Sequence, residues 1–312
     1  MGNERTYYPG GVWPVMVTPF CYNGEIDYGG LERLIDWYIE NGCSGLFTVC
    51  QSSEMFYLSL EERLKLAEAT VKMVAGRVPV IASGNISDTF EKRVEEINLM
   101  AKTGVDAIIL ITNQFANAEE SDEVWINNCM EFLGQIDTDI PLGFYECPKP
   151  YKRLISLENL KKCAESGRFY FLKDTCCDTE LIKKRLEVIS GSKLQLYNAN
   201  TATLLESLKD GAAGFCGVMA NFHPDMYNYL CKHYEEENIE YLQDFLTVAS
   251  WIESQYYPVN AKYHLQKIES IPMTTYSRGL EEKGLTDTYK KEVIMLEELT
   301  AEFRKYYTEG EW

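Results

Sequence analysis

A lysine stands at the end of a buried strand-like segment, in the stretch Phe171-Leu172-Lys173-Asp174. Because side chains alternate between the two faces of a strand, Phe169, Phe171 and Lys173 are predicted to share one face. Desolvation at such a position disfavours the ammonium ion and favours the neutral amine, a nucleophile that attacks carbonyl carbons to form Schiff bases. The alternative is an ammonium ion that pairs with a carboxylate such as Asp174 or extends to solvent. The pattern alone leaves both open.

Tyr145 is the second residue of interest, because it ends the apolar segment Leu142–Phe144. In a barrel this segment would neighbour the strand that carries Lys173, so the phenol would approach the amine and relay a proton. A tyrosine at a strand end is also a common packing residue. Its expected position beside Lys173 favours the chemical role.

Polar side chains follow another strand-like segment at Gln51, Ser52 and Ser53, with Glu54 next. Hydroxyl groups and exposed backbone amides of this kind bind carboxylates, although an ordinary polar turn has the same composition. Further candidates for substrate contact lie near other strand ends: Phe115, Asn198, Asn200 and Cys216. No carboxylate cluster at the strand ends indicates Mg²⁺, so metal-dependent barrel chemistry is disfavoured and no metal or cofactor is expected.

The elements that must position these residues alternate between short apolar segments and amphipathic segments of helical length. Eight strands are predicted, at 12–17, 45–49, 78–82, 107–111, 142–145, 169–173, 194–197 and 213–218. Their continuous apolar character is typical of a sheet covered on both faces. The number and spacing predict an α/β fold, a (β/α)₈ TIM barrel. A doubly wound sheet is the alternative, but no Gly-x-Gly-x-x-Gly follows the first strand.

From about His223 the alternation stops and consecutive helices are predicted. No linker rich in Pro, Gly or Ser separates them from the preceding part. We therefore predict a barrel over residues 1–222 and a C-terminal helical extension, packed on the barrel, over residues 223–312.

The composition argues against several classes of protein. The formal net charge of −18 argues against nucleic-acid binding, which needs clustered Lys and Arg. Neither a secretory signal nor a membrane-spanning segment is evident. The ten cysteines include no Cys-x-x-Cys pair and are interpreted as reduced thiols of a cytoplasmic protein. The three histidines, His223, His233 and His264, have no metal-ligand spacing, so a zinc site is not expected.

Four segments together resemble a known family. They are Pro14 to Phe20 (Pro-x-x-x-Thr-Pro-Phe), Gln51-Ser52-Ser53-Glu54, Tyr145-x-x-Pro148 and Lys173-Asp174-Thr175. Their order is similar to that of the dihydrodipicolinate synthase / N-acetylneuraminate lyase family, and further similarities extend over nearly the whole chain. The resemblance implies a (β/α)₈ barrel with C-terminal helices, assembled as a homotetramer or homodimer.

The resemblance also implies class I aldolase chemistry on a 2-oxo acid such as pyruvate. Lys173 would form the Schiff base, Tyr145 would transfer protons, and Ser52 with neighbouring amides would hold the carboxylate. Glu54 would be a structural member of the loop.

Several positions depart from the family pattern. The usual Gly-[Thr/Ser]-Thr-Gly-Glu is Cys50-Gln51-Ser52-Ser53-Glu54 here. The synthases have a second tyrosine after the fourth strand, where this chain has Phe115. They also have an arginine shortly after Tyr-x-x-Pro, where this chain has Lys149-Pro150-Tyr151. Sialic acid lyases have acidic residues after the seventh strand, where this chain has only amides.

The leading hypothesis is therefore a lyase or aldolase, carbon–carbon or carbon–oxygen, that acts on a 2-oxo acid, either pyruvate or a sugar-acid-like 2-oxo acid, and is not a true dihydrodipicolinate synthase. The alternative is a family member that has lost turnover and serves as a 2-oxo acid binding or regulatory protein.

Overall fold

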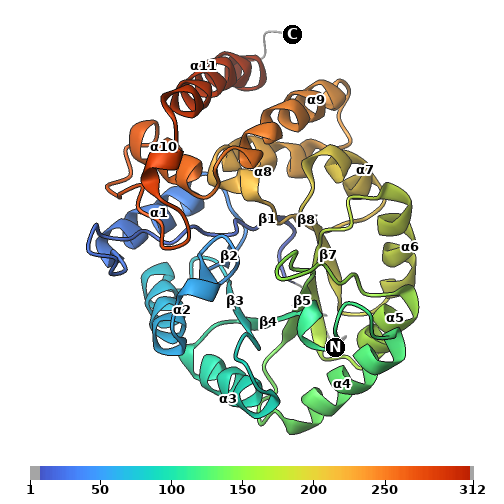
Figure 1. Ribbon diagram of the computed structural model, residues 1–312. Coiled ribbons are helices and arrows are strands. Elements are labelled where there is room, and N and C mark those ends of the chain that lie inside the picture. The colour runs from blue at the N-terminus through green and yellow to red at the C-terminus, as the bar shows by residue number, and fades with distance from the viewer. Residues whose placement is uncertain (1–7, 310–312) are drawn as a thin grey trace.

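Eight parallel strands curl into a barrel in the computed structural model, which describes residues 8–309 and the side chains of residues 8–305 (Figure 1). The hydrogen-bonded order is β1-β8-β7-β6-β5-β4-β3-β2. The strands are β1 (Gly11–Val12), β2 (Leu46–Phe47), β3 (Val80–Gly84), β4 (Ala107–Ile111), β5 (Leu142–Tyr145), β6 (Phe169–Asp174), β7 (Gln195–Asn198) and β8 (Gly214–Phe215). The predicted (β/α)₈ barrel is confirmed.

The barrel closes between its first two strands through a parallel bridge of Val15 with Phe47. The first strand is shorter than the predicted 12–17, because Pro14 has no N–H to donate and interrupts the ladder. Pro14 still accepts a hydrogen bond from the amide of Phe47, at 3.1 Å, and Met16 donates to Phe47 at 3.0 Å. These bonds hold the first two strands together without regular pairing.

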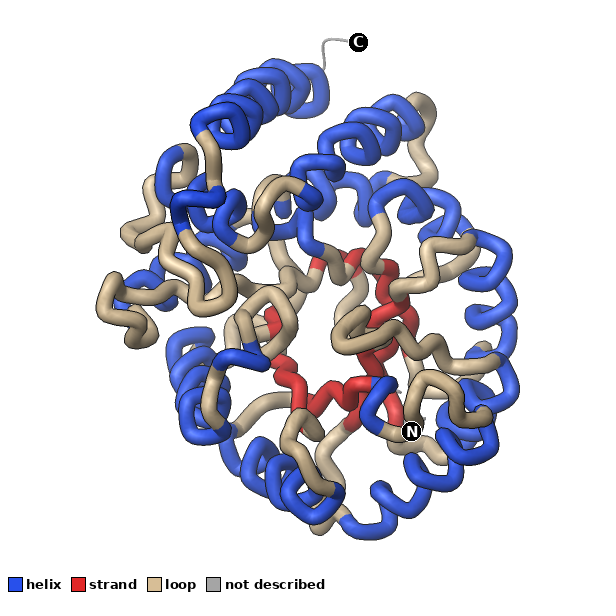
Figure 2. Tube along the Cα trace, in the orientation of Figure 1, coloured by secondary structure: helices blue, strands red, loops and turns tan. Residues whose placement is uncertain are grey.

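Helices surround the strands, as the tube in Figure 2 shows. They are α1 (Tyr28–Glu40), α2 (Leu60–Val74), α3 (Phe90–Met100), α4 (Asp122–Gln135), α5 (Leu157–Glu165), α6 (Thr179–Ile189), α7 (Leu204–Lys209), α8 (Pro224–His233), α9 (Ile239–Ala249), α10 (Val259–Lys267) and α11 (Asp287–Glu309). Ser59 and Glu62 form a capping box at the start of α2. Gly42, Gly104 and Gly211 have positive φ after their helices, as is common where a helix ends.

The C-terminal helices α9, α10 and α11 lie on one side of the barrel (Figure 1). The preceding helix, α8, packs on β1 and β8 and takes the place of an eighth barrel helix. The division at residues 222 and 223 therefore remains a prediction. Within residues 8–309, no helix has the length and apolar character needed to cross a bilayer.

Aromatic side chains fill the barrel interior below the mouth. Phe171 stacks on Tyr197 with ring centroids 4.1 Å apart and meets Trp13 edge-on at 5.2 Å. Phe171 therefore faces inward, as strand parity predicts, and so does Lys173 two residues later. Phe169 does not share that face. A register shift opposite Leu142 and Gly143 turns it outward, where it stacks on Phe144 at 4.1 Å.

Candidate active site

Lys173 and Tyr145 lie side by side at the barrel mouth. They are register partners on the neighbouring strands β6 and β5, so their side chains leave the sheet on the same side. The Lys173 amine lies 4.3 Å from the centroid of the Tyr145 ring. Both residues are only 4% exposed. Parallel pairing thus builds the predicted amine and phenol pair.

Burial shapes the electrostatics of this pair. It raises the pKa of the Tyr145 hydroxyl well above its usual 10, so Tyr145 is a neutral phenol that can donate or accept a proton. Among the described residues, no carboxylate oxygen lies within 4 Å of the Lys173 amine. The alternative pairing with Asp174 does not occur. The Lys173 amine therefore forms no direct ion pair and is left to face the pocket, with the Glu253 carboxyl acting on it only at longer range.

Asp174 instead belongs to a fully buried ionic cluster on the outer side of the barrel wall. Its carboxylate pairs with Arg185 of α6, which also binds Glu146 with N–O distances of 2.7 and 2.9 Å. Glu146 accepts from the amides of Ile155 at 2.8 Å and Thr175 at 3.2 Å. Because Glu146 follows Tyr145 and Asp174 follows Lys173, this cluster fixes the two strand ends that carry the phenol and the amine.

Gln51 reaches the same pair from the loop after β2. Its Oε1 lies 3.5 Å from the Tyr145 hydroxyl and 3.2 Å from the Cys147 thiol. Both groups can donate to this oxygen. The Gln51 side-chain amide therefore lies next to Tyr145. Gln51 stands at the position where the motif Gly-[Thr/Ser]-Thr-Gly-Glu has a hydroxyl-bearing residue.

Of the two serines in this loop, Ser52 lies at the pocket and Ser53 lies in the protein interior. Ser52 lines the pocket and shares a hydrogen bond with Tyr257. Ser53 does not line it, because its hydroxyl donates to the Cys50 carbonyl and accepts from the Cys50 amide at 2.7 and 2.8 Å. The Cys50 thiol is completely buried, and burial raises its pKa, with the nearby Lys173 acting in the opposite direction.

Of the other predicted contacts, only Asn200 lines the pocket. Phe115 packs outward on Trp125 and Phe132, with ring centroids 5.5 and 5.6 Å away. Asn198 is the register partner of Asp174 and likewise turns outward, so its amide donates to Thr203 and Ser207. Cys216 is buried beside the mouth, where burial raises its pKa to about 12 against the opposing effect of Lys173.

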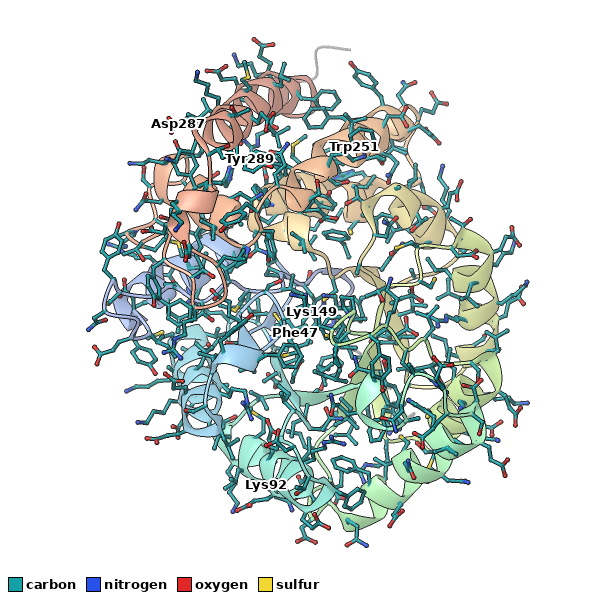
Figure 3. All side chains as sticks on the ribbon, viewed as in Figure 1. Phe47, Lys92, Lys149, Trp251, Asp287 and Tyr289 are labelled. Atoms are coloured by element: carbon teal, nitrogen blue, oxygen red, sulfur yellow. The ribbon has the colours of Figure 1, made fainter. Side chains whose placement is uncertain are left out.

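A pocket of about 1060 Å³ opens above Lys173 and Tyr145. Figure 3 labels Phe47 and Lys149 near the centre of the barrel, which marks the region of this mouth. Its wall combines apolar and aromatic residues with polar side chains from the barrel loops, including Ser87, Asp88, Gln114, Lys149, Lys152 and Thr175. This volume exceeds what a three-carbon acid requires.

The C-terminal part contributes wall residues that the sequence did not reveal: Glu253, Tyr257, Pro258, Ser277, Gly279 and Leu280. Glu253 is accessible to water within the concave pocket, yet protein atoms surround it, and this burial raises the pKa of its carboxyl to about 7. No strand pattern marks these positions. The only indication in the sequence that these residues belong to the site was the resemblance to the family across the C-terminal helices.

Glu54 joins the loop after β2 to this C-terminal wall. Its Oε1 accepts from the Lys262 ammonium at 2.7 Å, and its Oε2 accepts from the Ser277 hydroxyl at 2.8 Å and the Arg278 amide at 2.7 Å. Both carboxylate oxygens are thus occupied. Glu54 acts as a clamp between two walls of the pocket.

Fold and site together define a class: a (β/α)₈ barrel with a buried lysine and tyrosine at paired strand ends, open to a large pocket. The model of the dihydrodipicolinate synthetase family matches residues 8–287, and the chain belongs to this family. Members of the family are Schiff-base lyases and aldolases.

Curated relatives named 4-hydroxy-tetrahydrodipicolinate synthase are similar over most of their length. The relative from Thermodesulfovibrio yellowstonii is 28% identical over 278 residues, which cover 86% of this chain and 93% of the relative. The relative from Staphylococcus carnosus is 30% identical over 222 residues, 70% of this chain and 73% of the relative.

Solved structures share the fold. The dihydrodipicolinate synthase DapA-2 of Bacillus anthracis superposes with a TM-score of 0.83 at 22% identity, covering 93% of this chain and 98% of that one. YagE, a prophage protein of the same family from E. coli K12 solved in complex with pyruvate, gives 0.82 at 20% identity with the same coverage. These similarities confirm the predicted family and barrel.

Proposed function

We propose that this protein is a lyase or aldolase that cleaves or forms a bond in a hydroxylated 2-oxo acid through a Schiff base on Lys173. The observation that carries the proposal is the buried, carboxylate-free amine of Lys173, 4.3 Å from the Tyr145 ring centroid, at the base of the pocket. Pyruvate bound to YagE supports a 2-oxo acid as the ligand class.

The reaction begins when the neutral Lys173 amine attacks the C2 carbonyl. The carbonyl oxygen becomes a hydroxyl group, leaves as water and gives an iminium ion. In the cleavage direction the C3–C4 bond breaks, its electron pair forms an enamine, and a base removes the proton of the C4 hydroxyl. Protonation of the enamine and hydrolysis of the imine then release the 2-oxo acid and regenerate the amine.

Tyr145 is the proposed proton carrier for these steps. Its neutral phenol lies beside the amine, and Gln51 Oε1 at 3.5 Å orients the hydroxyl group. Ser52, on the pocket wall, is the proposed ligand of the substrate carboxylate together with neighbouring backbone amides. Cys216 contributes shape and low polarity beside the amine.

The pocket wall supports a hydroxylated substrate. Asn200 and Gln114 offer amide groups, and Ser87 a hydroxyl oxygen, over a volume of about 1060 Å³, and such groups bind hydroxyl groups of a sugar acid. We further propose that the chain is not a true dihydrodipicolinate synthase. Phe115 cannot transfer protons and packs against Trp125. No arginine stands at the place of Lys149-Pro150-Tyr151.

A panel of 2-oxo sugar acids, followed by detection of released pyruvate and of aldehyde by NMR, tests the proposal. Turnover of a hydroxylated 2-oxo acid, absent in Lys173→Ala, supports it. The second candidate function is 2-oxo acid binding without turnover, which the replacement of both family glycines by Cys50 and Ser53 favours. That function predicts thermal stabilisation by the same ligands, retained in Lys173→Ala, with no product.

A further inference from the structure

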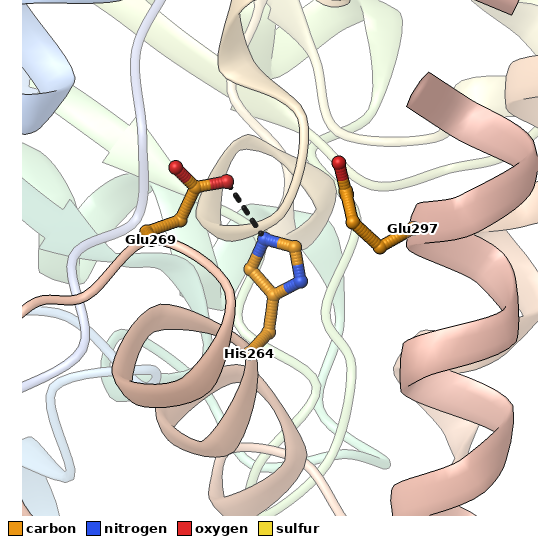
Figure 4. Close-up of side chains that lie close together, drawn as sticks. All are labelled: His264, Glu269 and Glu297. Atoms are coloured by element: carbon orange, nitrogen blue, oxygen red, sulfur yellow. Dashed lines mark ion pairs between the residues drawn. The ribbon is translucent and has the colours of Figure 1, made fainter. Parts of the chain in front are cut away.

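Two histidines and two glutamates gather away from the pocket, at the junction of α8, α10 and α11. His264 belongs to α10, Glu269 to the turn that follows it, and Glu297 to α11 (Figure 4). One potential ligand atom from each of these three residues lies within 4.8 Å of those of the other two. His223, at the start of α8, has its ring centroid 5.7 Å from that of His264. The sequence did not predict this grouping, because 41 positions along the chain separate the two histidines.

The two histidine rings are buried with incompletely satisfied nitrogens. His223 is 0% exposed and His264 is 1% exposed. The Nε2 atoms of both rings have long contacts with carboxylate oxygens, at 3.3 Å to Glu297 and 3.4 Å to Glu269, and Nδ1 of His223 has no hydrogen-bond partner within the described part of the chain. Buried polar atoms are nearly always closely paired in folded proteins, so one unpaired nitrogen and two long contacts in one cluster point to a ligand between these groups.

Each carboxylate is held by one oxygen and directs the other into the cluster. Glu269 Oε2 accepts from the Trp37 indole at 2.9 Å, while its Oε1 lies 3.4 Å from His264 Nε2. Glu297 Oε1 accepts from Arg304 at 2.5 Å, while its Oε2 lies 3.3 Å from His223 Nε2 and has no hydrogen bond. Trp37 and Arg304 thus orient the carboxylates in the way that outer groups orient metal ligands.

The spacing agrees with coordination better than with hydrogen bonding. Ligand atoms about 2.1 Å from a tetrahedral zinc ion lie about 3.4 Å from one another. The two histidine–glutamate pairs already have separations of 3.3 and 3.4 Å. The Glu269 and Glu297 side chains are 21% and 13% exposed, which leaves the ion a route from solvent.

We propose that His264, Glu269 and Glu297 bind one divalent cation of the zinc type, and that His223, which lies outside this three-residue group but 3.3 Å from Glu297, moves toward the ion as the fourth ligand. Imidazole nitrogen with carboxylate oxygen is a donor set that suits Zn²⁺. With both rings neutral, the two carboxylates carry the charge that the cation neutralises, and Arg304 is already shared with Asp225 at 2.8 Å.

The cation would be structural. None of its four ligands lines the pocket, and the ligands come from α8, α10 and α11 and the turn between the last two. It would fasten α11 to the helix that also carries Lys262, the partner of the Glu54 clamp. The proposal is independent of the proposed function, because it requires neither Lys173 nor turnover.

Metal binding to the full chain tests the proposal. We expect the protein, freed of metal with chelator and dialysed, to bind one Zn²⁺ and, with Co²⁺ as a probe, to show the visible absorption of a tetrahedral site without thiolate-to-cobalt charge transfer. Glu269→Gln keeps an oxygen for Trp37, and Glu297→Gln keeps one for Arg304. Each is expected to weaken Zn²⁺ binding at least tenfold and to abolish the rise in Tm that Zn²⁺ gives the unaltered protein.

His233→Gln is the matched control, because His233 is a solvent-exposed histidine that also pairs with a glutamate, Glu236, at 2.6 Å. It is expected to bind Zn²⁺ like the unaltered protein. Circular dichroism establishes that all three variants are folded. Failure of the unaltered protein to bind stoichiometric Zn²⁺ would overturn the proposal. Zn²⁺ binding by both glutamine variants as tight as that of the unaltered protein would also overturn it. So would a Co²⁺ spectrum dominated by thiolate ligands.

Discussion

The Lys173 amine lies 4.3 Å from the centroid of the Tyr145 ring, and the two residues are register partners in a parallel pair of strands. Backbone hydrogen bonding, rather than a flexible loop, sets their separation. A buried ionic cluster immediately outside the barrel wall then fixes both strand ends. Amine and phenol are thereby preorganised before a substrate arrives.

Tyr145→Phe tests the phenol. Removal of the hydroxyl group leaves the ring against Lys173 and removes the proton carrier, so kcat is expected to fall by about 10²–10⁴ with a small change in KM. Steady-state kinetics on the substrate found in the 2-oxo acid panel measures this. Tyr170→Phe is the control, because Tyr170 lies on β6, the strand that carries Lys173, and its hydroxyl group contacts Lys193 instead. An unchanged kcat in Tyr145→Phe would remove this residue from the proposed mechanism.

Glu253→Gln tests the C-terminal wall. Because burial raises the pKa of this carboxyl to about 7, the group changes charge within the working pH range. We expect kcat/KM of the unaltered protein to change through pH 7 and the variant to lose that titration. A pH–rate profile from 5.5 to 8.5 makes the measurement. Identical profiles would show that Glu253 does not contact the reacting substrate.

Arg185→Met tests the cluster behind the strand ends. The substitution leaves Glu146 and Asp174 buried without their cation, which is expected to cost about 3–5 kcal/mol of unfolding free energy. Urea denaturation followed by tryptophan fluorescence reports it. Lys162→Met, which removes an exposed pair with Glu158, is the control and should leave the unfolding free energy nearly unchanged. Similar losses in both variants would contradict a special role for the cluster.

Glu62→Gln tests a pH-dependent tether between α2 and the C-terminal segment. The hydrogen bond from Arg278 lowers the pKa of Glu62 from 4.5 to about 2. A carboxyl whose pKa is lower in the folded state stabilises the fold above its ordinary pKa, and this contribution disappears as the pH falls toward 2. The variant should therefore lose less stability between pH 5 and pH 2.5 in urea titrations. Parallel pH dependence in both proteins would exclude the tether.

Several features were predictable from the sequence because they depend on local patterns. Alternation of apolar and amphipathic segments predicts the barrel, and strand parity points Lys173 inward. Parity also shows why other predictions failed to reach the pocket: Asn198 ends its strand on the outward face, where it binds Ser207. The end of a strand gives the height of a residue along the barrel axis. Whether its side chain enters the mouth depends on which face of the strand it lies on.

Features that depend on tertiary packing were not predictable. The register shift beside Gly143 reverses the face of Phe169, and no apolar pattern reveals such a shift. Glu253 reaches the pocket from the C-terminal part, far from the strand ends in sequence. His223 and His264 have no metal-ligand spacing, yet helix packing brings their rings edge-on.

Trapping of an imine on Lys173 tests the central claim most directly. The protein is incubated with pyruvate or a hydroxylated 2-oxo acid, treated with borohydride, digested and analysed by peptide mass spectrometry. We expect a reduced adduct on the peptide containing Lys173, absent in Lys173→Ala and retained when exposed Lys162 is changed to Ala. No adduct on Lys173 across a broad set of 2-oxo acids, from a folded protein, would contradict it.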